Sequence, residues 1–379
     1  MTNMIKRVFH LISFIVFASA ITLMSCIYDA PRDNPNEVSM KYYAYVTNYG
    51  SANVTAYAIN PDTGVLAVVA GSPFSAGNQP RGVTVDPTGK FLYVANIGSN
   101  DVSAYTINAA TGALTAIAGS PFAAGTGPFG VTVHPTGKFL YVTNSDSNNV
   151  SAYTINAVTG ALSVIAGSPF ATQTTPMLQA VDPTGKFLYV PNFTSGNVSA
   201  YTINLETGVL AAISGSPFIT GTQPCSVTVN PTGKFAYVAS ENGGKVYAYA
   251  INPDTGALSA TISGSPFTAG TDPVSVTVDP TGKFTYVANY TSSNVSAYTI
   301  NLETGVLAAI SGSPFAAGTN PQFVTVDPTG KFAYAANYNS ANVSAYTINS
   351  DTGALTAISG SPIAAGTNPF NVITTRVAQ

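Results

Sequence analysis

The chain repeats one pattern of apolar and polar positions from residue 41 to its end. Short runs rich in Val, Tyr, Phe and Ala alternate with clusters of Gly, Pro, Asn and Thr, a pattern typical of strands and turns. A tyrosine in a Tyr-Val/Ala-x-Asn/Ser phrase marks each unit, and successive tyrosines are 48, 48, 48, 48, 49 and 48 residues apart. A period in the forties predicts a β-propeller with one four-stranded blade per repeat. The seven marker positions are Tyr45, Tyr93, Tyr141, Tyr189, Tyr237, Tyr286 and Tyr334.

One unit shows how a blade is encoded. The turn Asp86-Pro-Thr-Gly89 combines a proline that presets φ with a glycine that accepts positive φ, which predicts a type I turn closed by a glycine bulge. The following run, Phe91–Ala95, is apolar at consecutive positions, as expected for a strand covered on both faces by neighbouring blades. The four strands predicted for this unit are 82–85, 91–95, 102–107 and 113–118.

The two ends of the repeat region complement each other. The chain enters at Lys41–Asn48, which matches the second strand of a unit, and finishes with Asn368–Thr375, which matches a first strand. We therefore predict that the C-terminal strand completes blade 1 and closes the ring without a free edge. The predicted fold is all-β, a seven-bladed β-propeller with four-stranded blades over residues 41–379.

The first 40 residues have a different composition. Lys6 and Arg7 precede the apolar run Leu11–Thr22, and Leu23-Met24-Ser25-Cys26 resembles the lipobox of bacterial lipoprotein signal peptides. This resemblance implies a signal peptide at residues 1–25, lipid on Cys26 and a flexible polar tether at residues 26–40. The expected location is the cell envelope, at the outer membrane or cell surface. An ordinary cleaved signal peptide and an uncleaved anchor are the alternatives.

Composition excludes several classes of function. Charged residues make up 8% of the chain and the net charge is −3, so no basic surface supports nucleic-acid binding. Only His10 and His134 occur, which leaves no histidine-based zinc site or Ser-His-Asp triad, and we predict neither a metal nor a cofactor. His134 replaces the Asp of a repeated turn and is expected to be structural. The repeated Pro-Thr-Gly-Lys is a hairpin turn rather than a phosphate loop, because phenylalanine follows the lysine.

Comparison of the units with one another locates a candidate site. Two windows differ most: the residues after the proline that opens each first strand, and the loop between second and third strands. Propeller topology brings both windows to one face, at the mouth of the central channel, and functional loops diverge while their scaffold is kept. Aromatic and amide side chains there suit sugars or peptides. The predicted ligand-binding face comprises Arg81, Phe129, Met177, Gln179, Gln322, Phe323, Phe370, Tyr49, Phe193, Tyr290 and Tyr338.

The repeated phrases carry a family resemblance. Tyr-Val-Thr-Asn at 45–48 and 141–144, with the PTGKFLYV and SAYTIN phrases, resembles YVTN-type surface propellers and the wider seven-bladed lactonase (6-phosphogluconolactonase-like) family. That family implies hydrolysis by His, Arg and carboxylate groups at the channel mouth. Arg81 and Glu241 are candidates for the last two groups, and no histidine falls on that face.

The sequence alone therefore favours a non-catalytic module over an enzyme. We expect a monomeric propeller, held at a membrane through lipid on Cys26, that binds a glycan, peptide or matrix-type ligand at the channel mouth. The alternative is a lactonase-type hydrolase acting on a lactone at the central channel.

Overall fold

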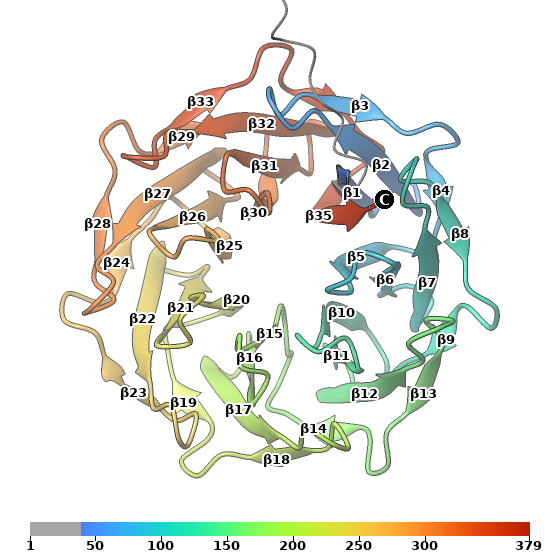
Figure 1. Cartoon of the computed structure of the whole chain (residues 1–379). Helices are drawn as coiled ribbons and strands as arrows, with labels where there is room; N and C mark the ends of the chain where they lie inside the picture. Colours follow the sequence, from blue (N-terminus) through green and yellow to red (C-terminus); the bar gives the residue numbers. More distant parts are fainter. Residues whose placement is uncertain (1–38) are drawn as a thin grey trace, which may run out of the picture. The chain divides into compact units, whose positions relative to one another are not determined.

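A computed structural model describes residues 39–379; the predicted signal peptide, Cys26 and most of the predicted tether lie outside the described residues. Residues 39–379 form seven antiparallel sheets arranged as a ring (Figure 1), which confirms the predicted seven-bladed propeller. Within this part of the chain, no helix has the length and apolarity needed to cross a membrane.

Each blade is a sheet that runs from the central channel to the rim. The innermost strands are β35 (Pro369–Ala378), β5 (Pro80–Val85), β10 (Pro128–Val133), β15 (Ala180–Val181), β20 (Pro224–Val229), β25 (Pro273–Val278) and β30 (Pro321–Val326). The second strands are β1 (Met40–Asn48), β6 (Phe91–Asn96), β11 (Phe139–Asn144), β16 (Phe187–Asn192), β21 (Phe235–Ser240), β26 (Phe284–Asn289) and β31 (Phe332–Asn337). The third strands are β2 (Asn53–Ile59), β7 (Asp101–Ile107), β12 (Asn149–Ile155), β17 (Asn197–Ile203), β22 (Lys245–Ile251), β27 (Asn294–Ile300) and β32 (Asn342–Ile348). The fourth strands are β3 (Leu66–Val68), β8 (Leu114–Ala116), β13 (Leu162–Val164), β18 (Leu210–Ala212), β23 (Leu258–Thr261), β28 (Leu307–Ala309) and β33 (Leu355–Ala357).

A fifth, two-residue strand accompanies each blade and pairs with the third strand. It follows a cis Ser-Pro peptide bond in every repeat. In blade 2 the hydroxyl of Ser120 accepts a hydrogen bond from the Ala104 amide at 2.9 Å. The repeated Gly-Ser-Pro-Phe phrase therefore fastens the crossing segment to its own blade, a role that the sequence did not indicate. These strands are β4 (Phe74–Ser75), β9 (Phe122–Ala123), β14 (Phe170–Ala171), β19 (Phe218–Ile219), β24 (Phe267–Thr268), β29 (Phe315–Ala316) and β34 (Ile363–Ala364).

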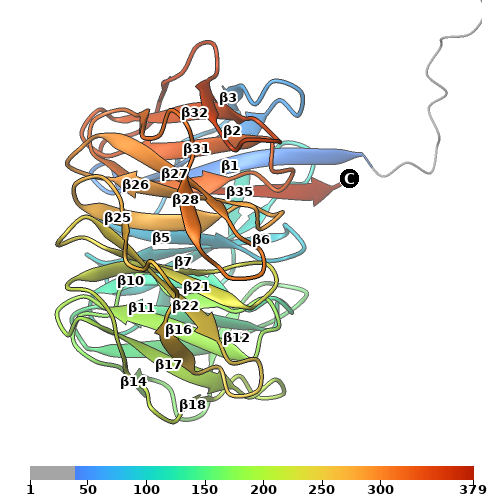
Figure 2. The same ribbon diagram turned by 90° about the vertical axis from the view of Figure 1, so that its left-hand side faces the viewer.

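The ring closes where the two ends of the described chain meet. β35 pairs with β1 in antiparallel register, from Met40 opposite Ala378 to Asn48 opposite Pro369. Figure 2 shows both strands side by side. The C-terminal strand thus supplies the innermost strand of blade 1, as the sequence predicted.

The hydrophobic core is divided among the spaces between adjacent blades. Phe91, Tyr93 and Ala95 of β6 pack toward blade 3, whereas Leu92 and Val94 of the same strand pack toward blade 1. All six residues of β6 are buried, which explains why this strand is apolar at consecutive positions. An equivalent cluster joins blade 7 to blade 1, so the hydrophobic packing continues around the whole ring.

The marker tyrosine of each repeat also bonds to the next blade. Its hydroxyl donates to the carbonyl of the glycine that ends the outer turn of the following blade, and both groups are buried. The last bond, from Tyr334 to the Gly64 carbonyl at 2.8 Å, spans the closure of the ring. The other six pairs are Tyr45–Gly112, Tyr93–Gly160, Tyr141–Gly208, Tyr189–Gly256, Tyr237–Gly305 and Tyr286–Gly353, at 2.7–3.0 Å.

The repeated Asp-Pro-Thr-Gly segments are hairpin turns, as predicted. Gly89 has a φ of 72°, and the Asp86 carboxylate accepts hydrogen bonds from the Lys90 and Phe91 amides at 2.7 and 2.6 Å. In blade 3 His134 takes this position and is fully buried, with Nε2 2.8 Å from the Gly185 carbonyl. Burial lowers the pKa of His134. The histidine is therefore a structural part of a turn.

Candidate active site at the channel mouth

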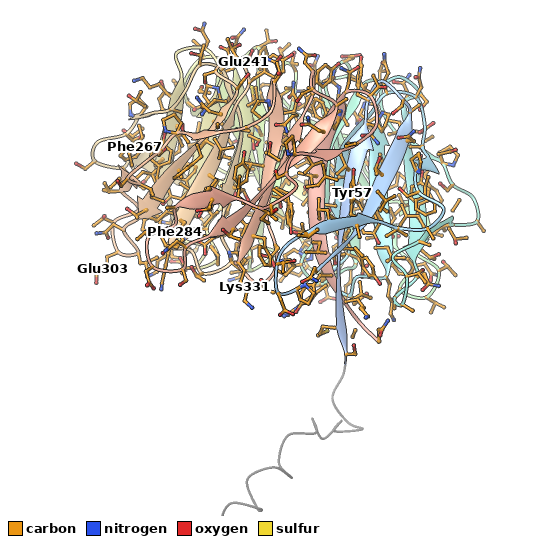
Figure 3. All side chains as sticks on the ribbon, turned by 90° about the horizontal axis from the view of Figure 1, so that it is seen from above. Tyr57, Glu241, Phe267, Phe284, Glu303 and Lys331 are labelled. Atoms are coloured by element: carbon orange, nitrogen blue, oxygen red, sulfur yellow. The ribbon has the colours of Figure 1, made fainter. Side chains whose placement is uncertain are left out.

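The two divergent windows meet in one cavity of about 190 Å³ at the mouth of the channel. Figure 3 shows Glu241 on this face and Lys331, from a repeated turn, on the opposite face. Six residues of the predicted ligand-binding face line the cavity together with Glu241. The complete lining is Phe129, Met177, Leu178, Phe193, Cys225, Glu241, Val274, Tyr290, Gln322 and Phe370.

Blade 4 is irregular at the point where this cavity adjoins the channel. The innermost strand is shortened to β15, and Leu178 forms a parallel bridge with Ser226 of blade 5. The Leu178 amide donates to the Cys225 carbonyl at 3.1 Å, and the Val227 amide donates to the Leu178 carbonyl at 3.2 Å. Because Leu178 lines both spaces, it lies at the boundary between the mouth cavity and the channel.

Two residues of the predicted ligand-binding face, Gln179 and Phe323, line the channel instead, a space of about 230 Å³. The Gln179 side chain is bonded to the scaffold: Nε2 donates to the Tyr141 carbonyl at 2.9 Å, and Oε1 accepts from the Thr143 hydroxyl at 3.2 Å. The neighbouring blade has Gly130 at this point, and a Cβ there would collide with Gln179. Gln179 therefore fills a gap between blades 3 and 4.

Arg81 lies beside the cavity in a cluster of aromatic rings. Its guanidinium carbon is 4.6 Å from the ring centres of Phe129 and Phe370 and 5.0 Å from that of Tyr49. Nε is buried without a hydrogen-bond partner, and burial lowers the pKa of Arg81. Tyr338 adjoins the cluster, with its ring centre 6.0 Å from that of Tyr49. Arg81 is not among the lining residues, although it packs against two of the lining rings, Phe129 and Phe370.

Glu241 contributes a carboxylate to the cavity wall. The thiol of Cys225, which is only 2% exposed, donates to Glu241 Oε2 at 3.3 Å. Burial, reinforced by this carboxylate, raises the pKa of Cys225 well above its usual value. The sulfur therefore stays protonated and orients Glu241, whereas a nucleophilic cysteine needs a lowered pKa.

The local scaffold changes in the blade that carries Glu241. In blade 3, Asn144 at the end of the second strand bonds to Asn149 at 2.7 Å and to Ser151 at 2.9 Å, an arrangement that recurs in other blades. Blade 5 has Ser240, Lys245 and Tyr247 at these positions, and Lys245 Nζ donates to the Thr268 hydroxyl at 2.9 Å. Blade 5 thus differs from the other blades at three scaffold positions near Glu241, and this difference is visible in the sequence.

The described residues offer no obvious metal centre. Within residues 39–379, no three His, Cys, Asp or Glu side chains gather closely enough to hold a metal ion.

Comparison with known proteins identifies the family. The model for "Lactonase, 7-bladed beta-propeller" matches residues 36–127, 116–219 and 181–372. The periplasmic gluconolactonase of Pseudomonas aeruginosa superposes with a TM-score of 0.75 at 20% identity, covering 89% of this chain and 99% of that one. A candidate 6-phosphogluconolactonase from Bacteroides uniformis gives 0.77 at 22% identity, covering 88% and 99%. Curated proteins gave no match. At these identities the structural likeness shows the fold, and the family model carries the assignment: this chain belongs to the lactonase family of seven-bladed β-propellers.

Proposed function

We propose that the protein is a lactone hydrolase that acts at the mouth cavity. Family membership favours this function over the non-catalytic module that the sequence alone favoured. The observation that carries the proposal is the position of Glu241, a carboxylate that lines the cavity at the end of the channel where both divergent windows meet.

Hydrolysis of a lactone requires an activated water molecule, and Glu241 is the general base in this proposal. Cys225 occupies one carboxylate oxygen, so the other is left to accept a proton from water. The water oxygen bonds to the lactone carbonyl carbon, the ring C–O bond then breaks, and the proton on Glu241 passes to the leaving alkoxide. The product is the open hydroxy acid. The amide of Gln322 and the hydroxyl of Tyr290 are the side-chain donors on the wall that can bind the carbonyl oxygen.

A panel of γ- and δ-lactones assayed by pH-stat titration tests the activity. The full-length protein in detergent is expected to hydrolyse at least one lactone faster than the spontaneous reaction. Glu241→Gln should lower kcat by about 100-fold or more, because general-base catalysis contributes roughly 10²–10⁴-fold. Asp146→Asn is the matched control, since Asp146 lies on the same face but is not a cavity-lining residue. A panel with no accelerated hydrolysis would refute the proposal.

Binding without turnover is the second candidate function, and one observation favours it. The ten lining residues include no histidine, whereas the family resemblance implies one. Calorimetric titration with oligosaccharides and peptides tests this function. Binding that is lost in Phe193→Ala, in a protein without lactonase activity, would support a glycan- or peptide-binding module.

We further propose that the propeller is exported and held in the cell envelope through lipid on Cys26. In support, β1 begins on the face that carries Lys331, opposite the face that carries Glu241 (Figure 3). Incorporation of labelled palmitate should be lost in Cys26→Ala, and labelling that survives this substitution would contradict the anchor.

A further inference from the structure

Apolar residues make up the larger part of the mouth-cavity lining, beside the polar side chains of Glu241, Tyr290 and Gln322. Six of the ten lining side chains are Phe, Met, Leu or Val, and Glu241 is the one residue among the ten with a formal charge. Arg81, which packs against two of the lining rings, is covered by Tyr49, Phe129 and Phe370. No lysine, arginine or histidine therefore belongs to the lining, and a phosphate or carboxylate on the ligand would meet a carboxylate without a compensating charge.

A second, open hollow of about 480 Å³ lies on the other side of Glu241. It runs between blades 5 and 6 and is formed by glycine and polar residues, among them Asn242, Gly244, Asp272 and Ser292. Gly244 has a φ of 63°, and a Cβ there would lie 2.8 Å from the Gly270 carbonyl, so the wall requires a glycine. Asp272 accepts a hydrogen bond from the Thr291 hydroxyl.

Glu241 therefore stands between the mouth cavity and this open groove, since it lines both. An apolar cavity of about 150 Å³ takes up a six-carbon ring such as benzene. The mouth cavity, at about 190 Å³, has room for an apolar group of about six carbons. A polyhydroxylated ring in the same space would lose the hydration of every hydroxyl group that faces the six apolar residues rather than Glu241, Tyr290 or Gln322.

We propose that the substrates are lactones with an apolar substituent of about six carbons. The substituent occupies the mouth cavity, and the lactone ring lies at Glu241 with its polar edge toward the groove. This inference rests on the proposed lactonase function. It differs from the sugar lactones that the names of the structural relatives indicate.

A homologous series of γ-lactones tests this substrate class. The series consists of γ-butyrolactone, γ-hexalactone, γ-octalactone, γ-decalactone and γ-dodecalactone, compared with glucono-δ-lactone and its 6-phosphate. We expect kcat/KM to rise about fourfold for each added methylene, the factor for a fully buried CH₂, and to level off near a six-carbon tail. Rates that are independent of tail length, or fastest with glucono-δ-lactone or its phosphate, would overturn the inference.

Cavity-filling variants locate the substituent. Val274→Phe and Leu178→Phe should move the optimum to shorter tails, and the second variant serves if the first does not fold, because Leu178 is only half-buried. Val68→Phe, on the exposed rim strand β3, adds the same ring elsewhere and should leave the optimum unchanged. An optimum that stays fixed in both cavity variants would place the substituent outside the cavity.

Binding to Glu241→Gln separates this inference from the proposed function. Calorimetry should show affinity that increases with tail length even in a protein that hydrolyses no lactone. Absence of turnover in the wild-type protein with tail-dependent binding would refute the lactonase function and keep the ligand class. Hydrolysis of lactones together with binding that does not depend on tail length would keep the lactonase function and refute the proposed substrate class.

Discussion

The bond from each marker tyrosine to the next blade makes a quantitative prediction about stability. In Tyr93→Phe the ring remains in the core, but the Gly160 carbonyl loses the hydroxyl that lies 2.8 Å away. Both groups are buried, and burial raises the pKa of Tyr93 far above its ordinary value, as expected for apolar surroundings. An unpaired buried acceptor costs about 1–3 kcal/mol, so the free energy of unfolding should fall by this amount.

Urea denaturation followed by circular dichroism measures the change. The midpoint should decrease while the m-value stays constant, because the surface exposed on unfolding is the same. The double variant Tyr93→Phe/Tyr237→Phe removes bonds at two separate interfaces that share no partner. Its decrease in the free energy of unfolding should therefore equal the sum of the decreases in the two single variants within about 0.5 kcal/mol. Tyr42→Phe, at a half-buried ring, is the matched control. If Tyr93→Phe changed stability no more than Tyr42→Phe, the inter-blade bond would not be a source of stability.

Three further predictions concern titration and Arg81. Burial lowers the pKa of His134 below its value in the unfolded chain, so the free energy of unfolding should decrease as pH falls below about 6.5. His134→Asn should abolish this part of the pH dependence in urea titrations, and an unchanged profile would contradict the prediction. Burial raises the pKa of Tyr346 to about 12, so this buried tyrosine keeps its proton in the fold and stability should fall above about pH 10. Tyr346→Phe should reduce this alkaline loss of stability in urea titrations, and an unchanged pH profile would contradict the reasoning. Arg81→Met should change the free energy of unfolding by less than about 1 kcal/mol, because Nε of the buried guanidinium has no hydrogen-bond partner. The rate of lactone hydrolysis should change less than threefold, because Arg81 does not line the cavity. An inactive but folded variant would make Arg81 catalytic.

The fold was largely predictable because every blade is subject to the same structural constraints. A strand between two neighbours must be apolar on both sides, and a tight hairpin needs proline and glycine at fixed positions, so both constraints are written in every unit. The incomplete first and last units likewise predicted the closure by β35. The fifth strand was missed because two residues after a Ser-Pro bond carry no strand periodicity.

The candidate site was predictable only as a face. Divergence among repeats selected Phe129, Met177, Phe193, Tyr290, Gln322 and Phe370, which do line one cavity. Which side chains face that cavity depends on neighbours that are distant in sequence. Gln179 turns into the scaffold because the adjacent blade has Gly130, and Arg81 is enclosed by rings from three separate segments. The hydrogen bond between Cys225 and Glu241 likewise joins two windows that the sequence keeps 16 residues apart.

We propose above all that Glu241 catalyses lactone hydrolysis at the mouth cavity. The most direct measurement is kcat for γ-decalactone in the wild-type protein, Glu241→Gln and Asp146→Asn, with folding verified for each by its urea midpoint. We predict hydrolysis that is at least about 100-fold slower in Glu241→Gln and unchanged within threefold in Asp146→Asn. Equal rates in the wild-type protein and a folded Glu241→Gln would contradict the claim.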